Sequence, residues 1–183
     1  ALNPDFSNPA YRELKWNTEL ARHLGNPFPA IILDNMMLSN HFLPALNSGG
    51  KYNPTTNTWT ATNTTGAPTG RLFHTAVWTD SEMIIWGGND FNPADTNTGG
   101  RYNPSTDTWL PTSVTNAASP RENHTAVWTG SEMIVFGGGF GDTLNTGGRY
   151  NPTSDTWIPT RTTNAPTGRW ENTAVWTGSE MII

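Results

Sequence analysis

Residues 99–109 read GGRYNPSTDTW, and the same string returns at residues 147–157 as GGRYNPTSDTW. A third copy, GGKYNPTTNTW, occupies residues 49–59. Counted from the first glycine of each copy, the string advances by 50 residues (49 to 99) and then by 48 (99 to 147). A fixed period of this length is typical of repeat proteins, in which each period is one structural unit.

A second string follows the same period. It reads HTAVWTDSEMIIWGG at residues 74–88, HTAVWTGSEMIVFGG at residues 124–138 and NTAVWTGSEMII at residues 172–183. Its copies are again 50 residues (74 to 124) and 48 residues (124 to 172) apart. Because two different strings share one period, the chain from residue 49 onward is predicted to consist of repeats.

Each period contains four short runs of β-branched and aromatic residues separated by turn residues, which predicts four β-strands. In the first complete period these runs lie at residues 75–79, 82–86, 100–103 and 108–110. Helical periodicity is absent from them. A four-stranded antiparallel sheet cannot bury both of its faces alone, so such sheets must stack, and radial stacking gives a β-propeller.

These residues resemble the kelch repeat, in which an apolar run ends in Gly-Gly and is followed by Arg-Tyr and Trp, with Arg-x-x-His at the start of the first strand. The resemblance covers residues 49–183. It implies an all-β, kelch-type propeller of four-stranded antiparallel blades, with the first strand of each blade innermost. Two positions depart from the pattern: Asn172 stands where the other copies have histidine, and Asn57 stands where they have aspartate.

The repeats predict a partial propeller. Two complete sets of four strands are flanked by half a set on each side, which makes about three blades, whereas propellers have at least about four. The last strand also ends at Ile183, before its aromatic residue and Gly-Gly. We therefore expect further residues or a partner chain to complete the ring and to cover the strand edge.

Residues 1–48 do not follow the repeat clearly and are predicted to form a separate N-terminal arm. Residues 30–33 and 36–40 fit a degenerate half-blade. Residues 9–25 fit either a short helix that ends at Gly25 or an extended arm rich in Asn-Pro turns, and the sequence leaves both alternatives open.

Residues that occur in every copy are interpreted as scaffold. The paired glycines end the second strand where the backbone must turn or approach closely, and the aromatic residues pack between blades, with a sugar-binding platform as the alternative. The repeated set comprises Gly87, Gly88, Gly137, Gly138, Tyr52, Tyr102, Tyr150, Trp59, Trp109 and Trp157.

Three kinds of repeated polar residue could carry chemistry. His74 and His124 could face the central channel, but two histidines without carboxylates at matching positions make a poor metal site, and we predict no metal. The arginine that opens each copy could attract an anion, yet its recurrence in register favours a bracing role. The repeated glutamate after the first strand shows no reason for a raised pKa, so we predict no catalytic residue and no cofactor.

Composition excludes several classes of function. The net charge is -5, the isoelectric point is near 5.2 and the chain has two lysines, which argues against nucleic acid as a partner. Cysteine is absent, which excludes disulfides and thiolate chemistry. No apolar stretch approaches the roughly 20 residues that span a bilayer. The abundance of Thr, Asn, Gly and Trp is similar to that of secreted bacterial kelch-like proteins, so we expect an extracellular or periplasmic location.

Residues that differ between copies are the candidates for binding, because loops that vary on a rigid scaffold commonly carry function. They lie in the loops between the second and third strands and in the linkers before each first strand, on one face of the predicted propeller. The predicted contact residues are Asp90, Phe91, Asp95, Phe140, Asp142, Phe73 and Trp170.

The sequence therefore predicts a noncatalytic module that binds a protein partner, in an extracellular or cell-envelope complex. The alternative is a carbohydrate-binding or carbohydrate-active propeller, because sialidases and galactose oxidase use similar scaffolds. The copper centre of galactose oxidase needs a tyrosine crosslinked to cysteine, which this chain lacks. A glycosidase needs two carboxylates at a fixed separation, and the loops do not single out such a pair.

Overall fold

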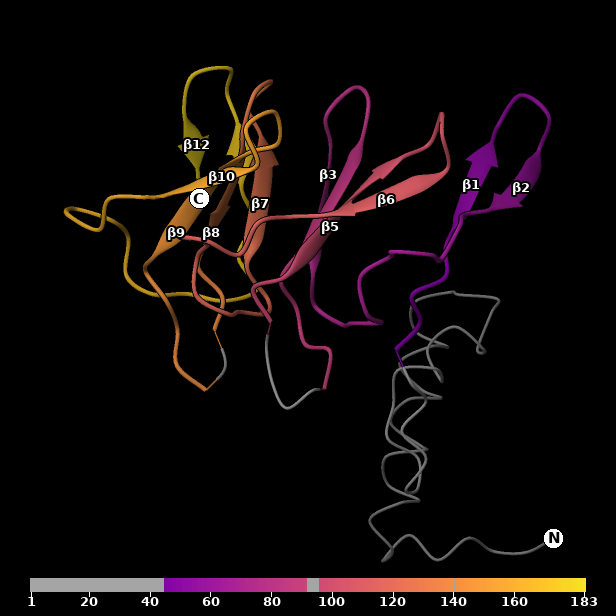
Figure 1. Ribbon diagram of the computed structural model, residues 1–183. Helices are drawn as coiled ribbons and strands as arrows, with labels where there is room; N and C mark the ends of the chain where they lie inside the picture. Colours follow the sequence, from indigo (N-terminus) through magenta and orange to yellow (C-terminus); the bar gives the residue numbers. More distant parts are fainter. Residues whose placement is uncertain (1–44, 92–95, 140) are drawn as a thin grey trace, which may run out of the picture. The chain divides into compact units, whose positions relative to one another are not determined.

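The computed structural model describes residues 45–91, 96–139 and 141–183 (Figure 1). The chain divides into two compact units, Ala1–Pro44 and Ala45–Ile183. The first unit lies outside the described residues, and with it the predicted helix or extended arm and the degenerate half-blade. The described residues contain no helix, and hence none that could cross a bilayer.

The second unit is built from antiparallel sheets in which every strand pairs with its neighbour in sequence. One four-stranded sheet has the order β3-β4-β5-β6 and another has the order β10-β9-β8-β7. The hairpins β1-β2 and β11-β12 form two further sheets. Their bounds are β1 Gly50–Asn53, β2 Thr58–Ala61, β3 Thr75–Trp78, β4 Met83–Trp86, β5 Gly99–Asn103, β6 Thr108–Pro111, β7 Thr125–Trp128, β8 Met133–Phe136, β9 Gly147–Asn151, β10 Thr156–Pro159, β11 Val175–Trp176 and β12 Met181–Ile182.

The predicted all-β architecture of four-stranded antiparallel blades in a partial propeller is confirmed. The four predicted strands of the first complete period correspond to β3, β4, β5 and β6, with ends that differ by one residue at most. The first strands of successive sheets lie beside one another, since β7 contacts both β3 and β11. This arrangement fits blades that stack side by side around an axis.

The hairpin between the third and fourth strands shows why its sequence is repeated. The side chain of Asn103 accepts hydrogen bonds from the backbone N–H groups of Ser105 (2.9 Å) and Thr106 (3.3 Å), which closes the turn. Asp107 then adopts a φ of 54°, in the left-handed region that aspartate and asparagine tolerate best. Asn57 and Asp155 take φ values of 54° and 52° at the equivalent positions.

The core lies between the two four-stranded sheets. Ile84, Trp86 and Val135 have no exposed surface, and Trp157 is 4% exposed. The rings of Trp86 and Trp157 come from different sheets and lie 5.0 Å apart between centroids. Burial of each such side chain contributes about 2–3 kcal/mol, so the aromatic contacts between sheets are a main source of stability.

Candidate functional site

The two ends of the sheets differ in kind (Figure 1). One end carries the short turns within the hairpins, for example residues 79–82 and 103–107, and we call it the turn end. The other end carries the linkers that precede β3 and β7 and the loops that follow β4 and β8, and we call it the linker end.

A buried arginine braces each complete sheet at the linker end. Arg121 has no exposed surface, and its Nη1 donates hydrogen bonds to the carbonyl oxygens of Gly137 (2.9 Å) and Thr146 (2.7 Å). Its Nε donates to the carbonyl of Ser119 at 3.0 Å. Burial lowers the pKa of Arg121 to about 10, so the side chain stays charged at neutral pH. Arg71 makes the equivalent bonds in the preceding sheet, which fits the bracing interpretation.

His124 fills the contact between neighbouring first strands. Its Nε2 forms a hydrogen bond with the hydroxyl of Thr75 at 2.8 Å, and its ring meets Trp86 edge to face with centroids 5.2 Å apart. Burial, with smaller contributions from the charges of Arg121 and His74, lowers the pKa of His124 to about 3. The ring is therefore neutral and structural at physiological pH. Among the described residues, no group of three or more His, Asp or Glu side chains could hold a metal ion.

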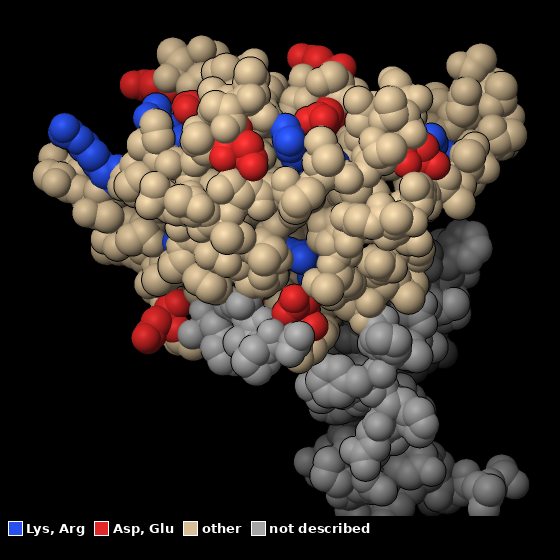
Figure 2. All heavy atoms as spheres, in the orientation of Figure 1, with Lys and Arg blue, Asp and Glu red and all other residues tan. Residues whose placement is uncertain are grey.

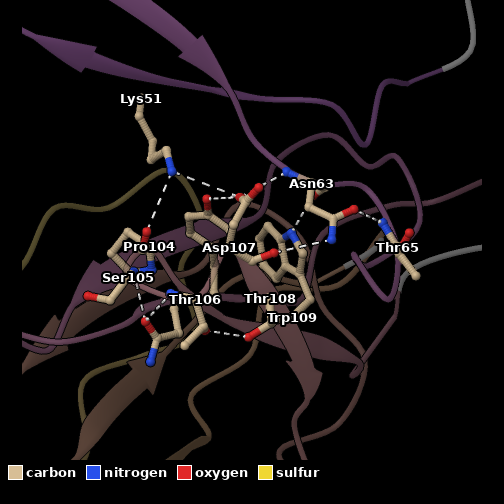
Figure 3. A network of polar contacts seen from close by, with 11 residues as sticks. Lys51, Asn63, Thr65, Pro104, Ser105, Thr106, Asp107, Thr108 and Trp109 are labelled. Carbon is tan, nitrogen blue, oxygen red and sulfur yellow. Dashed lines mark hydrogen bonds and ion pairs between the residues drawn. The ribbon is translucent and has the colours of Figure 1, made fainter.

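A polar latch joins each hairpin at the turn end to the linker of the preceding sheet (Figure 3). Asp107 accepts hydrogen bonds from the hydroxyl of Tyr102 and from the backbone N–H of Asn63, the latter at 3.1 Å. The indole of Trp109 donates to the carbonyl of Asn63 at 2.9 Å, and Lys51 lies 3.9 Å from Asp107. Several contacts hold the pKa of Asp107 below its usual range, and the hydrogen bond from Tyr102 has the largest effect.

The same latch recurs one period later, where Asp155 accepts from the backbone N–H of Ser113 at 2.8 Å. Trp157 donates to the carbonyl of Ser113 at 2.9 Å. The bond of this aspartate to the preceding linker was not predicted from the sequence, because it joins residues more than 40 positions apart.

A cleft of about 500 Å³ opens at the turn end between the two four-stranded sheets. Arg101 crosses it, donating from Nη1 to the carbonyl of Pro152 at 2.6 Å and lying 3.8 Å from the carboxylate of Glu82. The next copy holds the equivalent pair, Arg149 and Glu132, at 3.4 Å. Because this ion pair recurs with the period, we assign it to the scaffold.

The varying residues of the linkers form a continuous backbone arrangement at the linker end. Phe73, Asn123 and Glu171 occupy equivalent positions, with φ values of 57°, 54° and 52°. The N–H of Asn123 donates to the carbonyl of Phe73 at 3.1 Å, and the N–H of Glu171 donates to the carbonyl of Asn123 at 2.9 Å. We call these three residues, together with the residue before each, the linker ladder; the preceding residues are Leu72, Glu122 and Trp170.

The ladder carries strained and exposed residues. A φ near +55° is unfavourable for phenylalanine and glutamate, costing of order 1–3 kcal/mol, and such strain is concentrated at functional sites. Phe73 is 54% exposed and Trp170 is 50% exposed. Neither the left-handed conformation nor the hydrogen bonds between copies is visible in the sequence, because Phe and Glu carry no preference for that conformation.

The loops after the second strands are attached to the ladder. Leu72 and Asn89 exchange two backbone hydrogen bonds of 2.9 Å. These bonds place the loop with Asp90 and Phe91 beside the first residues of the ladder, Leu72 and Phe73. Asp90 accepts a hydrogen bond from the hydroxyl of Thr69 at 3.0 Å, and Phe91 is 44% exposed.

Glu122, which belongs to the next part of the ladder, similarly holds the loop that follows β8 through its backbone. The N–H of Gly139 donates to the carbonyl of Glu122 at 3.1 Å, and the exposed Asp142 follows in this loop. The structure thus brings Phe73, Trp170 and the two loops to one end of the sheets. The remaining two predicted contact residues, Asp95 and Phe140, lie outside the described residues.

Residues 41–183 match the family model of the KLHDC2/KLHL20/DRC7 Kelch-repeats domain. No curated protein matches the chain.

Proposed function

Because the chain belongs to the Kelch-repeat family, whose domains are usually noncatalytic modules that bind other proteins, we propose that it binds a protein partner through the linker ladder. The observation that carries this proposal is the ladder itself. It combines exposed aromatic side chains with a backbone conformation that the residues do not prefer, at the positions where the copies differ.

The contrast with the rest of the unit supports this choice of surface. The repeated residues Arg121, Asp155 and Trp157 bond to the backbone of their own or the neighbouring sheet. Phe73 and Trp170 instead present about half of their surface to solvent. Aromatic side chains of this kind are typical centres of protein interfaces, where burial of one ring contributes about 1.5–3 kcal/mol.

The proposed setting is an extracellular or periplasmic complex, which the Thr- and Asn-rich composition with two lysines supports. We further propose that the interaction is noncatalytic. Glu82 and Glu132 of the turn end are engaged in ion pairs, and Asp90 accepts a hydrogen bond within the linker end.

The experiment is site-specific photocrosslinking of the chain in its native extract, with a benzophenone amino acid at position 73 and, as a matched control, at position 110. Leu110 is 52% exposed but belongs to β6, a repeated strand outside the linker end. Mass spectrometry should identify a protein that crosslinks at position 73 and not at position 110. The affinity of the purified partner should then fall at least tenfold with Phe73→Ser or Trp170→Ser, and remain unchanged with Leu110→Ser.

Equal crosslinking at both positions, or no protein at position 73, would refute the ladder as the docking surface. A glycan-array signal abolished by Phe73→Ser would favour the carbohydrate alternative instead.

A further inference from the structure

Each polar latch between neighbouring sheets is made of two halves. The hairpin half is the turn between the third and fourth strands together with the tryptophan that follows it, and the linker half is the segment after the fourth strand of the preceding sheet. The linker half also carries a basic side chain, since Lys51 donates to the carbonyl of Pro104 at 3.5 Å and Arg101 donates to that of Pro152 at 2.6 Å. The two occupied latches therefore share one set of contacts.

The hairpin β1–β2 is a hairpin half that holds no linker among the described residues. Tyr52 donates to the side chain of Asn57 at 2.8 Å, and the rings of Tyr52 and Trp59 lie 5.0 Å apart with a tilt of 40°. The equivalent rings of the occupied hairpin β5–β6 lie 4.9 Å apart with the same tilt. Trp59 is nevertheless 71% exposed, whereas the equivalent Trp157 is 4% exposed. This hairpin half is therefore preformed and open.

The linker after β10 is a linker half that touches no hairpin in the described part of the chain. It reads TRTTNAP at residues 160–166, and the two linkers that hairpins hold read TNTTGAP at residues 62–68 and TSVTNAA at residues 112–118. Its turn is the same, because the N–H of Ala165 donates to the carbonyl of Thr162 at 3.1 Å, the distance of the equivalent bond in the first linker. The side chain of Arg149, its basic residue, is 43% exposed, against 16% for Arg101. This half is also preformed and open.

The two open halves lie at opposite edges of the described unit. Figure 1 places the hairpin β1–β2 at one edge and the linker after β10 at the other, with both four-stranded sheets between them. In Figure 2 a blue side chain projects outward at the edge of this linker, and the surface of the hairpin at the other edge is mostly uncharged. One copy therefore cannot join its own two halves.

We infer that two copies of this chain assemble head to tail, with the linker half of one docked on the hairpin β1–β2 of the other. Residues 160–166 of the first copy lie on Asn57 and Trp59 of the second, in the manner of the occupied latches. Arg149 of the first copy then reaches the carbonyl of Pro54 in the second. This assembly is a property separate from binding at the linker ladder.

Continuity with the occupied latches selects a second copy as the occupant. The linker string occurs at residues 62–68, 112–118 and 160–166, and residues 1–48 contain no copy of it. Hairpins of the same chain hold the first two copies of the string, which leaves the third for the open hairpin. The docking also sets β12 of one copy beside β1 of the other, which is the order of second and third strands in β4–β5 and β8–β9.

Two identical junctions close the assembly into a ring. Each copy contributes two four-stranded sheets, and each junction completes another from β11–β12 of one copy and β1–β2 of the other. The ring then has six sheets, which lies within the range of about four to eight blades in propellers. A head-to-tail contact that closes in this way gives a dimer instead of a filament.

The test is the molar mass of the full chain by sedimentation velocity at about 50 μM and in a dilution series. The wild type should be a dimer, with twice the 20.0 kDa of one chain. Trp59→Ser and Pro166→Asp should each weaken dimerisation at least tenfold. Both residues are exposed, whereas Ala118, the counterpart of Pro166, is 8% exposed and packs on β9. Leu110→Ser and Val114→Asp, at positions that are each 52% exposed in the occupied junctions, are the matched controls and should remain dimers.

Mixing the two weakened variants tests whether positions 59 and 166 meet each other. A mixed dimer has one junction in which both halves are wild type and one in which both are altered, so dimers should partly return in the mixture. Positions that contact unrelated surfaces would recover nothing. Circular dichroism spectra and melting temperatures equal to those of the wild type would show that the variants fold normally.

A monomeric wild-type chain would overturn the inference, because it would show that the hairpin β1–β2 does not dock on a second copy. Dimers that persist in both variants, or a mixture that stays monomeric, would overturn it as well, and long polymers would contradict the closed ring. These outcomes are separable from a failure of the proposed function. Phe73→Ser should leave the dimer intact, and Trp59→Ser should leave crosslinking from position 73 unchanged.

Discussion

Replacing His124 with asparagine should make the stability of the protein less sensitive to acid. His124 is 6% exposed, and its ring lies against Trp86 and within hydrogen-bond distance of Thr75. Burial is the main reason that its pKa falls from 6.5 to about 3 in the folded protein. The His124 ring of the unfolded chain therefore binds a proton near pH 6.5, whereas the ring in the folded protein stays neutral down to about pH 3. The unfolding free energy is therefore highest above pH 6.5 and declines as the pH falls toward 3.

The magnitude follows from the difference between the two pKa values. One unit of pKa corresponds to about 1.4 kcal/mol, so a shift from 6.5 to about 3 makes a total contribution of about 5 kcal/mol. Between pH 7 and pH 4.5 the part of this stabilisation that is lost is about 2–3 kcal/mol. Asparagine does not titrate in this range, and the chain itself uses Asn172 at the equivalent position of the third copy.

The assay is urea unfolding of the full chain, followed by tryptophan fluorescence, at pH values from 7 to 4.5. The difference in unfolding free energy between wild type and His124→Asn should shrink by about 2–3 kcal/mol over this interval. His74→Asn is the matched control, because His74 is the exposed copy of the same position and should give a much smaller change. A difference that stays constant within about 0.5 kcal/mol would refute the conclusion that His124 is held neutral by burial.

Two further pairs of substitutions compare a residue in close contact with its surroundings with a matched residue that has few contacts. Arg121→Met leaves the buried carbonyls of its sheet without their donor and should cost about 3 kcal/mol or more in urea unfolding, whereas Arg169→Met, which removes a single hydrogen bond, should cost about 1 kcal/mol or less. Gly87→Ala places a methyl group 2.6 Å from the His124 ring and should lower the melting temperature more than Gly130→Ala, whose methyl group meets no atom within 4 Å although both glycines have a positive φ. Equal losses within either pair would contradict the contacts described for Arg121 or Gly87.

The sequence predicted the sheets well because their determinants are local. Short runs of β-branched and aromatic residues set the strands, Asn-Pro turns close the hairpins between third and fourth strands, and the repeated period gives each copy the same pattern. Asn103 illustrates this, since its turn is closed by residues only two and three positions away.

The candidate site was predicted only in part. Variation between copies singled out residues that the structure brings to one end of the sheets, including Phe73 and Trp170, and their part in binding stays a prediction. The left-handed backbone of the ladder and the hydrogen bonds that join Phe73, Asn123 and Glu171 were not predictable. They arise from how separate periods stack, and a single sequence holds no direct record of contacts between positions about 50 residues apart.

The hydrogen bonds of the linker ladder have a consequence for how binding specificity could change. Phe73, Asn123 and Glu171 are joined through their main chains, so their spacing is set by peptide geometry whatever side chains they bear. A substitution at one of them alters a single chemical feature and leaves the positions of the others intact. Kelch proteins of this design could acquire new partners by point substitutions alone, without inserting or lengthening a loop.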